Sequence, residues 1–133
     1  MITIEQLLKN KKIIEEKTRE KEMTLELKSF KDNEAFGDGE ITIRSLDPKK
    51  LREITEKSND DVYTFNKNVV YDSISSLDLK SKELHTAYGC KTNPLDIVEK
   101  LFYPNEIKAI ADEVSKLSGL NKEEGLIKEI KKQ

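Results

Sequence analysis

The residues best suited to covalent chemistry in this chain are its single histidine, His85, and its single cysteine, Cys90. A catalytic dyad would need both, because an imidazole base activates a thiol nucleophile. They lie five positions apart, near a predicted helix end at Gly89, so a contact between their side chains is geometrically conceivable. Neither an oxyanion-hole glycine motif nor an orienting carboxylate accompanies them. We therefore interpret His85 as a surface histidine and Cys90 as a structural thiol.

A second candidate is an acidic loop that invites a calcium hypothesis, with side chains at Asp32, Glu34, Asp38 and Glu40. On an EF-hand loop starting at Asp32, Gly37 takes the sixth position, as required. The fifth and twelfth positions are Phe36 and Ile43, where that loop needs oxygen ligands. We therefore interpret the loop as turn-forming residues with solvating charge. A single cysteine also excludes a multi-thiolate zinc site, so we expect neither metal nor cofactor.

Charge and hydropathy favour a protein partner. The chain has 24 Lys and Arg against 26 Asp and Glu, and the two signs are interleaved, as in residues 9–22. Nucleic-acid modules usually concentrate positive charge on one face, so no nucleic-acid partner is expected. No stretch approaches the roughly 18 apolar residues of a membrane span, and residues 1–10 lack the apolar centre of a signal peptide. We expect a cytoplasmic protein with no membrane partner.

Hydrophobic periodicity predicts an α+β fold, a mainly helical single domain with one antiparallel β-hairpin packed on five or six helices. Apolar residues alternate with polar ones at 23–28 and again at 41–44, on either side of a glycine-containing loop. A two-stranded hairpin is marginally stable alone, so its apolar face must lie on helices. Caps and 3.6-residue spacing place helices at about 48–58, 65–77, 81–89, 94–102 and 104–118.

The predicted organisation is a charged N-terminal helix or arm over residues 1–22, a globular domain over 23–120, and a fraying C-terminal helix over 121–133. Gly119 is expected in the left-handed conformation that closes the last helix of the domain.

Two apolar groups are candidates for partner binding. Three residues share one helical face near the N-terminus. Two interpretations of this face remain open, namely binding to a partner and docking on its own domain. A second group precedes Pro104, where a packed corner between two helices is favoured over an interaction hot spot. The candidates are Ile4, Leu7 and Leu8, and then Leu101, Phe102 and Tyr103.

Short motifs in the last third of the chain carry a family resemblance. Tyr88-Gly89 ends a short segment, a Leu-rich helix follows at 95–102, Glu106-Ile107 opens another helix, and residues 117–119 read Leu-Ser-Gly. In these features, residues 78–120 resemble the XkdN-like tail assembly chaperones of contractile-tailed phages and prophages of Gram-positive bacteria.

The resemblance implies a non-enzymatic factor of the host cytoplasm, absent from the mature tail, that binds the tape measure protein and keeps it soluble. It also implies the tail tube protein and a frameshifted longer form of the chain as partners, and it leaves a weak homo-oligomer open. No catalytic residues are carried over. The rival interpretation is a small prophage-encoded adaptor or regulatory domain that binds a folded protein. A third interpretation, kept only as a formal alternative, is a hydrolase that uses His85 and Cys90.

Overall fold

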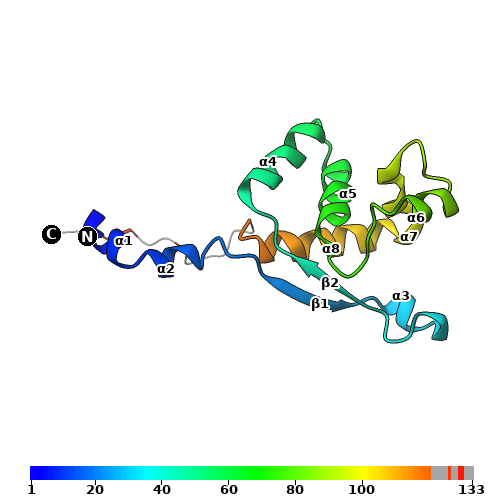
Figure 1. The fold of residues 1–133 in the computed structure, drawn as a ribbon, viewed down its shortest axis with the longest axis horizontal. Coiled ribbons are helices and arrows are strands. Elements are labelled where there is room, and N and C mark those ends of the chain that lie inside the picture. The colour runs from blue at the N-terminus through cyan, green and yellow to red at the C-terminus, as the bar shows by residue number, and fades with distance from the viewer. Residues whose placement is uncertain (121–125, 127–128, 131–133) are drawn as a thin grey trace.

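The chain begins with a helical arm that extends away from the rest of the molecule (Figure 1). A computed structural model describes residues 1–120, 126, 129 and 130. The arm contains α1 (Ile4–Lys9) and α2 (Lys11–Glu15), and neither helix has a buried residue. Thr3 opens α1 through a capping box, because its hydroxyl accepts the Gln6 amide while the Gln6 side chain accepts the Thr3 amide.

The predicted antiparallel hairpin is confirmed. Strand β1 (Glu22–Glu26) pairs with β2 (Glu40–Arg44), with Leu25 opposite Ile41. The predicted polar loop between the strands contains a helical turn, α3 (Lys28–Lys31), and a short 3₁₀ helix, η1 (Glu34–Phe36). One face of β2 is buried while β1 is mostly exposed, so the hairpin contributes to the core mainly through its second strand.

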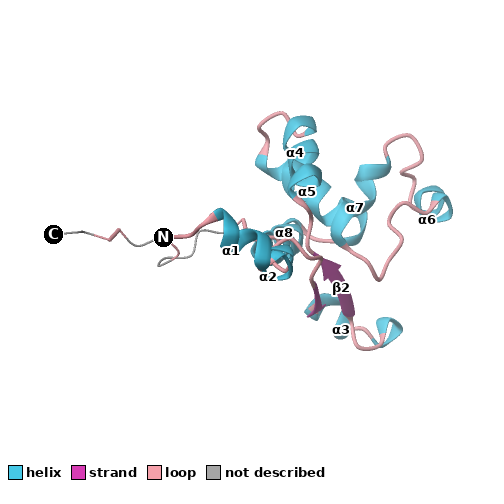
Figure 2. Cartoon of the chain, turned by 60° about the vertical axis from the view of Figure 1, so that its left-hand side comes forward, coloured by secondary structure: helices cyan, strands magenta, loops and turns pink. Residues whose placement is uncertain are grey.

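Among the described residues, five helices form the body of the molecule around the hairpin, and the mainly helical α+β class is confirmed. In both views, α4, α5 and α7 lie on one side of the hairpin (Figures 1 and 2). Helix α8 packs against both α5 and β2, so it connects the helices to the hairpin. The helices are α4 (Pro48–Lys57), α5 (Val62–Ser73), α6 (Lys82–Ala87), α7 (Ile97–Leu101), preceded by η2 (Pro94–Asp96), and α8 (Pro104–Leu117).

The core is a cluster of aliphatic side chains at helical spacing. Helix α8 contributes Ile107, Ile110, Ala111 and Val114, which lie on one face because they recur every three or four residues. Ile43 of β2 is fully buried in the same cluster. The remaining members come from α4, α5, α7 and the intervening segments, and include Ile54, Val69, Val70, Ile97, Val98 and Phe102.

Helix α5 ends earlier than the sequence predicts. The helix was expected to reach Leu77, but it ends at Ser73, and Ile74 forms an isolated antiparallel bridge with Ile43. The Ser75 amide then donates to the Thr42 carbonyl over 2.9 Å. A β-branched residue followed by serines has low helix propensity. Backbone groups at the edge of β2 can hydrogen-bond to this segment instead.

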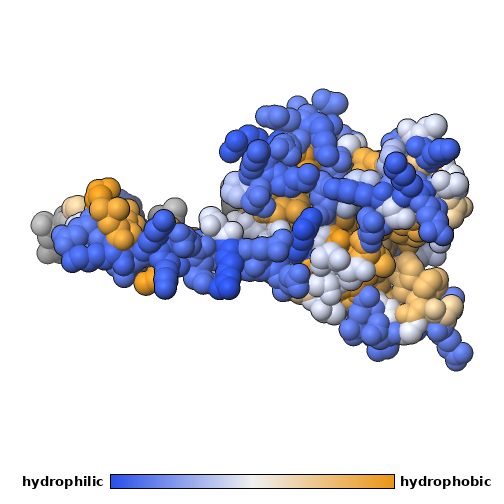
Figure 3. Space-filling model, viewed as in Figure 1, coloured by the Kyte–Doolittle hydropathy of each residue, from blue (hydrophilic) through white to orange (hydrophobic). Residues whose placement is uncertain are grey.

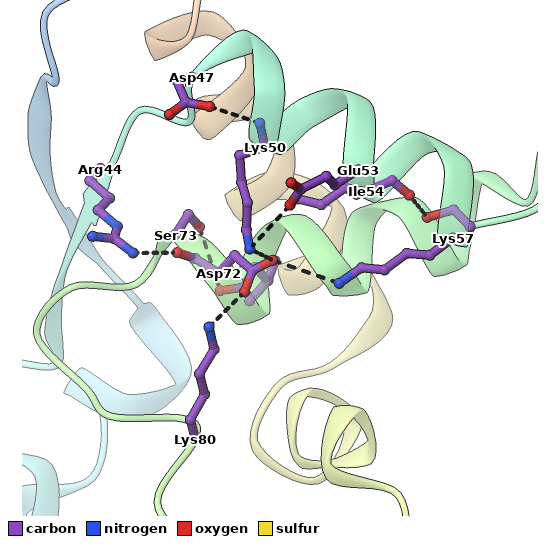
Figure 4. A network of polar contacts seen from close by, with 11 residues as sticks. Arg44, Asp47, Lys50, Glu53, Ile54, Lys57, Asp72, Ser73 and Lys80 are labelled. Carbon is purple, nitrogen blue, oxygen red and sulfur yellow. Dashed lines mark hydrogen bonds and ion pairs between the residues drawn. The ribbon is translucent and has the colours of Figure 1, made fainter.

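A buried carboxylate ties α5 to α4 and to the segment before α6 (Figure 4). The Asp72 side chain is 3% exposed, and its carboxylate lies 3.1 Å from Lys80, 3.7 Å from Lys50 and 4.0 Å from Lys57. Arg44 donates to the Asp72 carbonyl over 3.2 Å. The three ammonium groups remain partly exposed, so each ion pair is weak and the network chiefly fixes orientation.

The left-handed conformation predicted for Gly119 is confirmed, with φ at +78°. The Gly119 amide donates to the Lys116 carbonyl over 3.1 Å, and the Leu120 amide donates to the Ser115 carbonyl over 2.9 Å. This pair of bonds is a Schellman motif. Gly119→Ala is expected to lower the free energy of unfolding by about 1 kcal/mol, because a Cβ is disfavoured at this φ. No neighbouring atom would lie within 4 Å of the new Cβ, so the backbone alone accounts for the loss. Thermal unfolding measures it; an unchanged midpoint would contradict the assignment.

Most of the C-terminal helix predicted for residues 121–133 lies outside the described residues. Among the helices that are described, none is both long enough and apolar enough to span a membrane.

Candidate functional site

His85 and Cys90 both have structural roles in this fold. His85 is buried, not a surface histidine as the sequence suggested, and its Nε2 donates to the Leu79 carbonyl over 2.5 Å. Its ring stacks on Tyr71 at a centroid distance of 6.5 Å. Cys90 is 1% exposed, and its amide donates to the His85 carbonyl over 2.7 Å. Sequence patterning did not indicate that His85 is buried, because α6 is too short to show a periodic apolar stripe. Tertiary contacts determine which face of α6 is buried.

Substitution of these two residues separates structure from chemistry. His85→Ala is expected to lower the free energy of unfolding by about 2 kcal/mol, because the Leu79 carbonyl would be left buried without its donor. Cys90→Ala is expected to lower it by about 1 kcal/mol, by removing one buried sulfur atom. Both variants should still support the wild-type function in a complementation assay run below their melting temperatures. Loss of function in a variant that melts like the wild type would show that the residue has a chemical role.

The acidic loop is organised by turn hydrogen bonds. The Asn33 side chain accepts the Ala35 amide over 3.0 Å, and the Asp38 side chain accepts the Glu40 amide over 3.0 Å. These are contacts in which short polar side chains fold a turn on their own backbone. Within the described part of the chain, no group of three or more His, Cys, Asp or Glu side chains is placed to hold a metal ion.

An apolar groove of about 510 Å³ lies at the α3 end of the hairpin. Figure 3 shows apolar surface gathered at that end of the body. The groove brings together the hairpin loop, the segment between α5 and α6, and the end of α7. Its apolar lining consists of Leu27, Phe30, Phe36, Ile41, Leu77, Leu79, Leu84, Leu101 and Phe102.

Close backbone packing and aromatic contacts build one wall of this apolar groove. The Leu27 amide donates to the Gly39 carbonyl over 2.9 Å, and Gly39 has a φ of +66°. Phe30 contacts Phe36 edge-on at 5.0 Å between ring centroids and Phe102 at 6.0 Å. Edge-to-face pairs of this kind add to the stabilisation from burial. The wall is therefore a packed structure and not a loose loop.

A long-range hydrogen bond fastens the same wall to α8. The Ser29 hydroxyl donates to the Glu106 carboxylate over 2.6 Å, although the two residues are 77 positions apart. The other oxygen of that carboxylate accepts the Tyr103 amide over 2.8 Å, at the start of α8. One glutamate thus caps a helix and holds the hairpin loop.

The charged residues that line the apolar groove are acidic. Glu40 and Asp78 are exposed at its surface, and neither forms an ion pair with another described residue. Lys31 is near but is hydrogen-bonded to Glu26, and that bond, with a smaller contribution from the charge of Glu40, raises the pKa of the Lys31 ammonium above its ordinary value. Its charge is thereby already matched locally, so the surface of the apolar groove keeps an acidic character.

The six candidate residues fall into two separate places. Leu101 and Phe102 line the apolar groove. Tyr103 is 67% exposed and lines an adjoining hollow of about 290 Å³. The other three lie on α1 in the arm, at the opposite end of the molecule, where Ile4 is 72%, Leu7 42% and Leu8 76% exposed (Figure 1).

Sequence reasoning missed most of the groove lining. Phe30 and Phe36 are large apolar residues in an otherwise polar loop, and that exception to the local pattern is a signal that sequence analysis did not use. Leu77 and Leu79 carried no such signal, because the early end of α5 determines where they lie.

Comparison with known proteins gives one finding. A model of the family described as phage XkdN-like tail assembly chaperone protein matches residues 4–131. That span includes the arm, the hairpin and every residue of the apolar groove. No curated protein and no solved structure matches the chain.

Proposed function

Because this chain belongs to the phage XkdN-like tail assembly chaperone family, we propose that it binds the tape measure protein of its own tail and keeps that protein soluble. Membership of the family supports a role in tail assembly and binding to tail proteins. It also suggests a non-enzymatic role, in keeping with the buried, structural positions of His85 and Cys90. We place this activity in the host cytoplasm, before the tail is complete, and expect the chain to be absent from the mature tail.

The observation that carries the proposal is the apolar groove. Two of its side chains are substantially exposed, Phe36 at 55% and Leu77 at 44%. Contiguous apolar surface of this kind marks an interaction site, because its burial against a partner is favourable. Phe30 in its wall is already packed against Phe36 and Phe102, so little ordering of these side chains is needed when a partner enters.

The nature of the client explains why such a surface would be useful. A tape measure protein is a very long helix, and an apolar seam along it would associate with other copies before assembly. A small domain in which 38% of residues are charged can cover part of that seam and keep the complex hydrated. Each contact would be weak and repeated, so many copies would coat one client. They would leave as the tail tube protein takes their place.

Coexpression with the tape measure protein of the same tail tests the proposal. The tape measure should be soluble in a sized complex with this chain and insoluble without it. Leu77→Arg should abolish that effect, because a charge would enter the apolar groove. Val62→Arg is the matched control, since Val62 is 71% exposed on α5 and does not line the groove. Equal insolubility with and without the chain, and no recovered complex, would favour the adaptor interpretation instead.

A further inference from the structure

The backbone around the apolar groove is already hydrogen-bonded within the chain. The amides of Phe30 and Lys31 donate to Leu27, and the amides of Gly39 and Leu79 donate to carbonyls two or three residues before them. The Leu79 carbonyl accepts His85 Nε2. An extended segment entering the groove would find few backbone partners, and its own amides would be left unsatisfied. An α-helix satisfies its own backbone, so a helix suits this lining.

The lining also determines what the helix must present. The floor is aliphatic and aromatic, which favours apolar side chains at positions i, i+3 or i+4, and i+7 of one helical face. At the surface of the groove, the carboxylates of Glu40 and Asp78 form no close ion pair with another described residue, and the Lys31 ammonium near Glu40 is already paired with Glu26. Cations beside the apolar stripe would therefore meet complementary charge, whereas carboxylates would be repelled.

We propose that the apolar groove binds one helical segment of the client whose apolar stripe is flanked by lysine or arginine. The proposal rests on the proposed function and adds the chemistry of the bound segment. Helix α1 has a similar character, because lysines at positions 9, 11 and 12 follow its apolar face. It lies at the opposite end of its own molecule, so the arm of a second copy is the competing occupant (Figure 1).

Overlapping synthetic peptides that tile the tape measure protein are the probe, each about 25 residues long so that helices can form. Their affinity for the full chain is measured by fluorescence anisotropy. The tightest binders should carry an apolar stripe flanked by Lys or Arg. The double substitution Glu40→Lys with Asp78→Lys should weaken them about tenfold, since each reversal replaces an attraction with a repulsion. Added salt should weaken binding to the wild type.

The control makes the same change in net charge elsewhere. Glu53→Lys with Glu56→Lys alters two exposed residues of α4, which does not line the groove, and should change affinity less than twofold. Leu8→Arg in the arm should also leave binding unchanged. A loss of binding in Leu8→Arg would place the site on the arm and overturn the inference.

The remaining outcomes separate this inference from the proposed function. If the tape measure is solubilised but the tightest peptides have neutral or acidic flanks, the inference fails and the function stands. The same holds if the Glu40→Lys, Asp78→Lys variant binds like the wild type. If no peptide binds, and the wild type self-associates as its concentration rises whereas the Glu40→Lys, Asp78→Lys variant does not, the occupant is a second copy. If no peptide binds and the tape measure is not solubilised, both fail.

Discussion

Gly39→Ala is expected to lower the free energy of unfolding by about 3 kcal/mol or more. A Cβ at this position would lie 2.5 Å from the Lys31 amide nitrogen and 3.0 Å from the Leu27 carbonyl oxygen. Both contacts are with backbone, which cannot rotate away as a side chain can. The φ of +66° adds a further penalty for any residue with a Cβ. Relief requires α3 to move, and Phe30 of that helical turn forms the wall of the apolar groove.

Gly37→Ala is the matched control in the same loop. Its φ is +60°, but no atom would lie within 4 Å of its Cβ, so the expected loss is only about 1 kcal/mol. Chemical denaturation of both variants measures the difference, and the client-solubility assay should fail for Gly39→Ala before it fails for Gly37→Ala. Equal losses of unfolding free energy in the two variants would mean that Gly39 does not pack closely against α3.

Ile43→Ala is expected to lower the free energy of unfolding by about 3 to 4 kcal/mol, because it removes a fully buried side chain and leaves a cavity. Ile43 lies in β2 and bridges to Ile74, so the cavity would form where the hairpin meets the end of α5. The substitution tests whether the hairpin belongs to the same cooperative core as the helices.

Ile13→Ala in α2 is the control with the same change in side chain. Ile13 is 65% exposed, and α2 has no buried residue, so the expected change is below about 0.5 kcal/mol. A loss from Ile13→Ala that approaches the loss from Ile43→Ala would mean that the arm packs on the body or on a second copy in solution.

The parts of the fold that the sequence predicted well are those with local causes. Asp47 accepts the Lys50 amide over 2.7 Å at the start of α4, which begins with Pro48 as the sequence predicts. Gly119 ends α8 through its own backbone. In each case the signal is a cap or a glycine within one turn of the boundary.

The errors arose where a tertiary contact overrode the local pattern. Ile74 fits the periodicity of α5, but it pairs with Ile43 instead, because the edge of β2 offers a backbone partner. His85 was interpreted as exposed, because nothing in its neighbourhood predicts that the Leu79 carbonyl and the Tyr71 ring would enclose it.

The candidate site shows the same division. Leu101 and Phe102 could be singled out, because the adjacent Pro104 marks a corner where apolar residues gather. The opposite wall of the apolar groove depends on how the hairpin loop folds and how it is fastened to α8. That arrangement rests on Gly39 packing against α3 and on the bond between Ser29 and Glu106, two contacts that hydrophobic periodicity does not encode.

The most direct test of the central claim is amide hydrogen exchange in the free chain and in its complex with the tape measure protein. Client binding through the apolar groove should slow exchange in residues 27–41, 77–84 and 98–103, and leave the exposed face of α4 unchanged. Slowed exchange only in the arm or on α4, with the groove segments exchanging as in the free chain, would contradict the account.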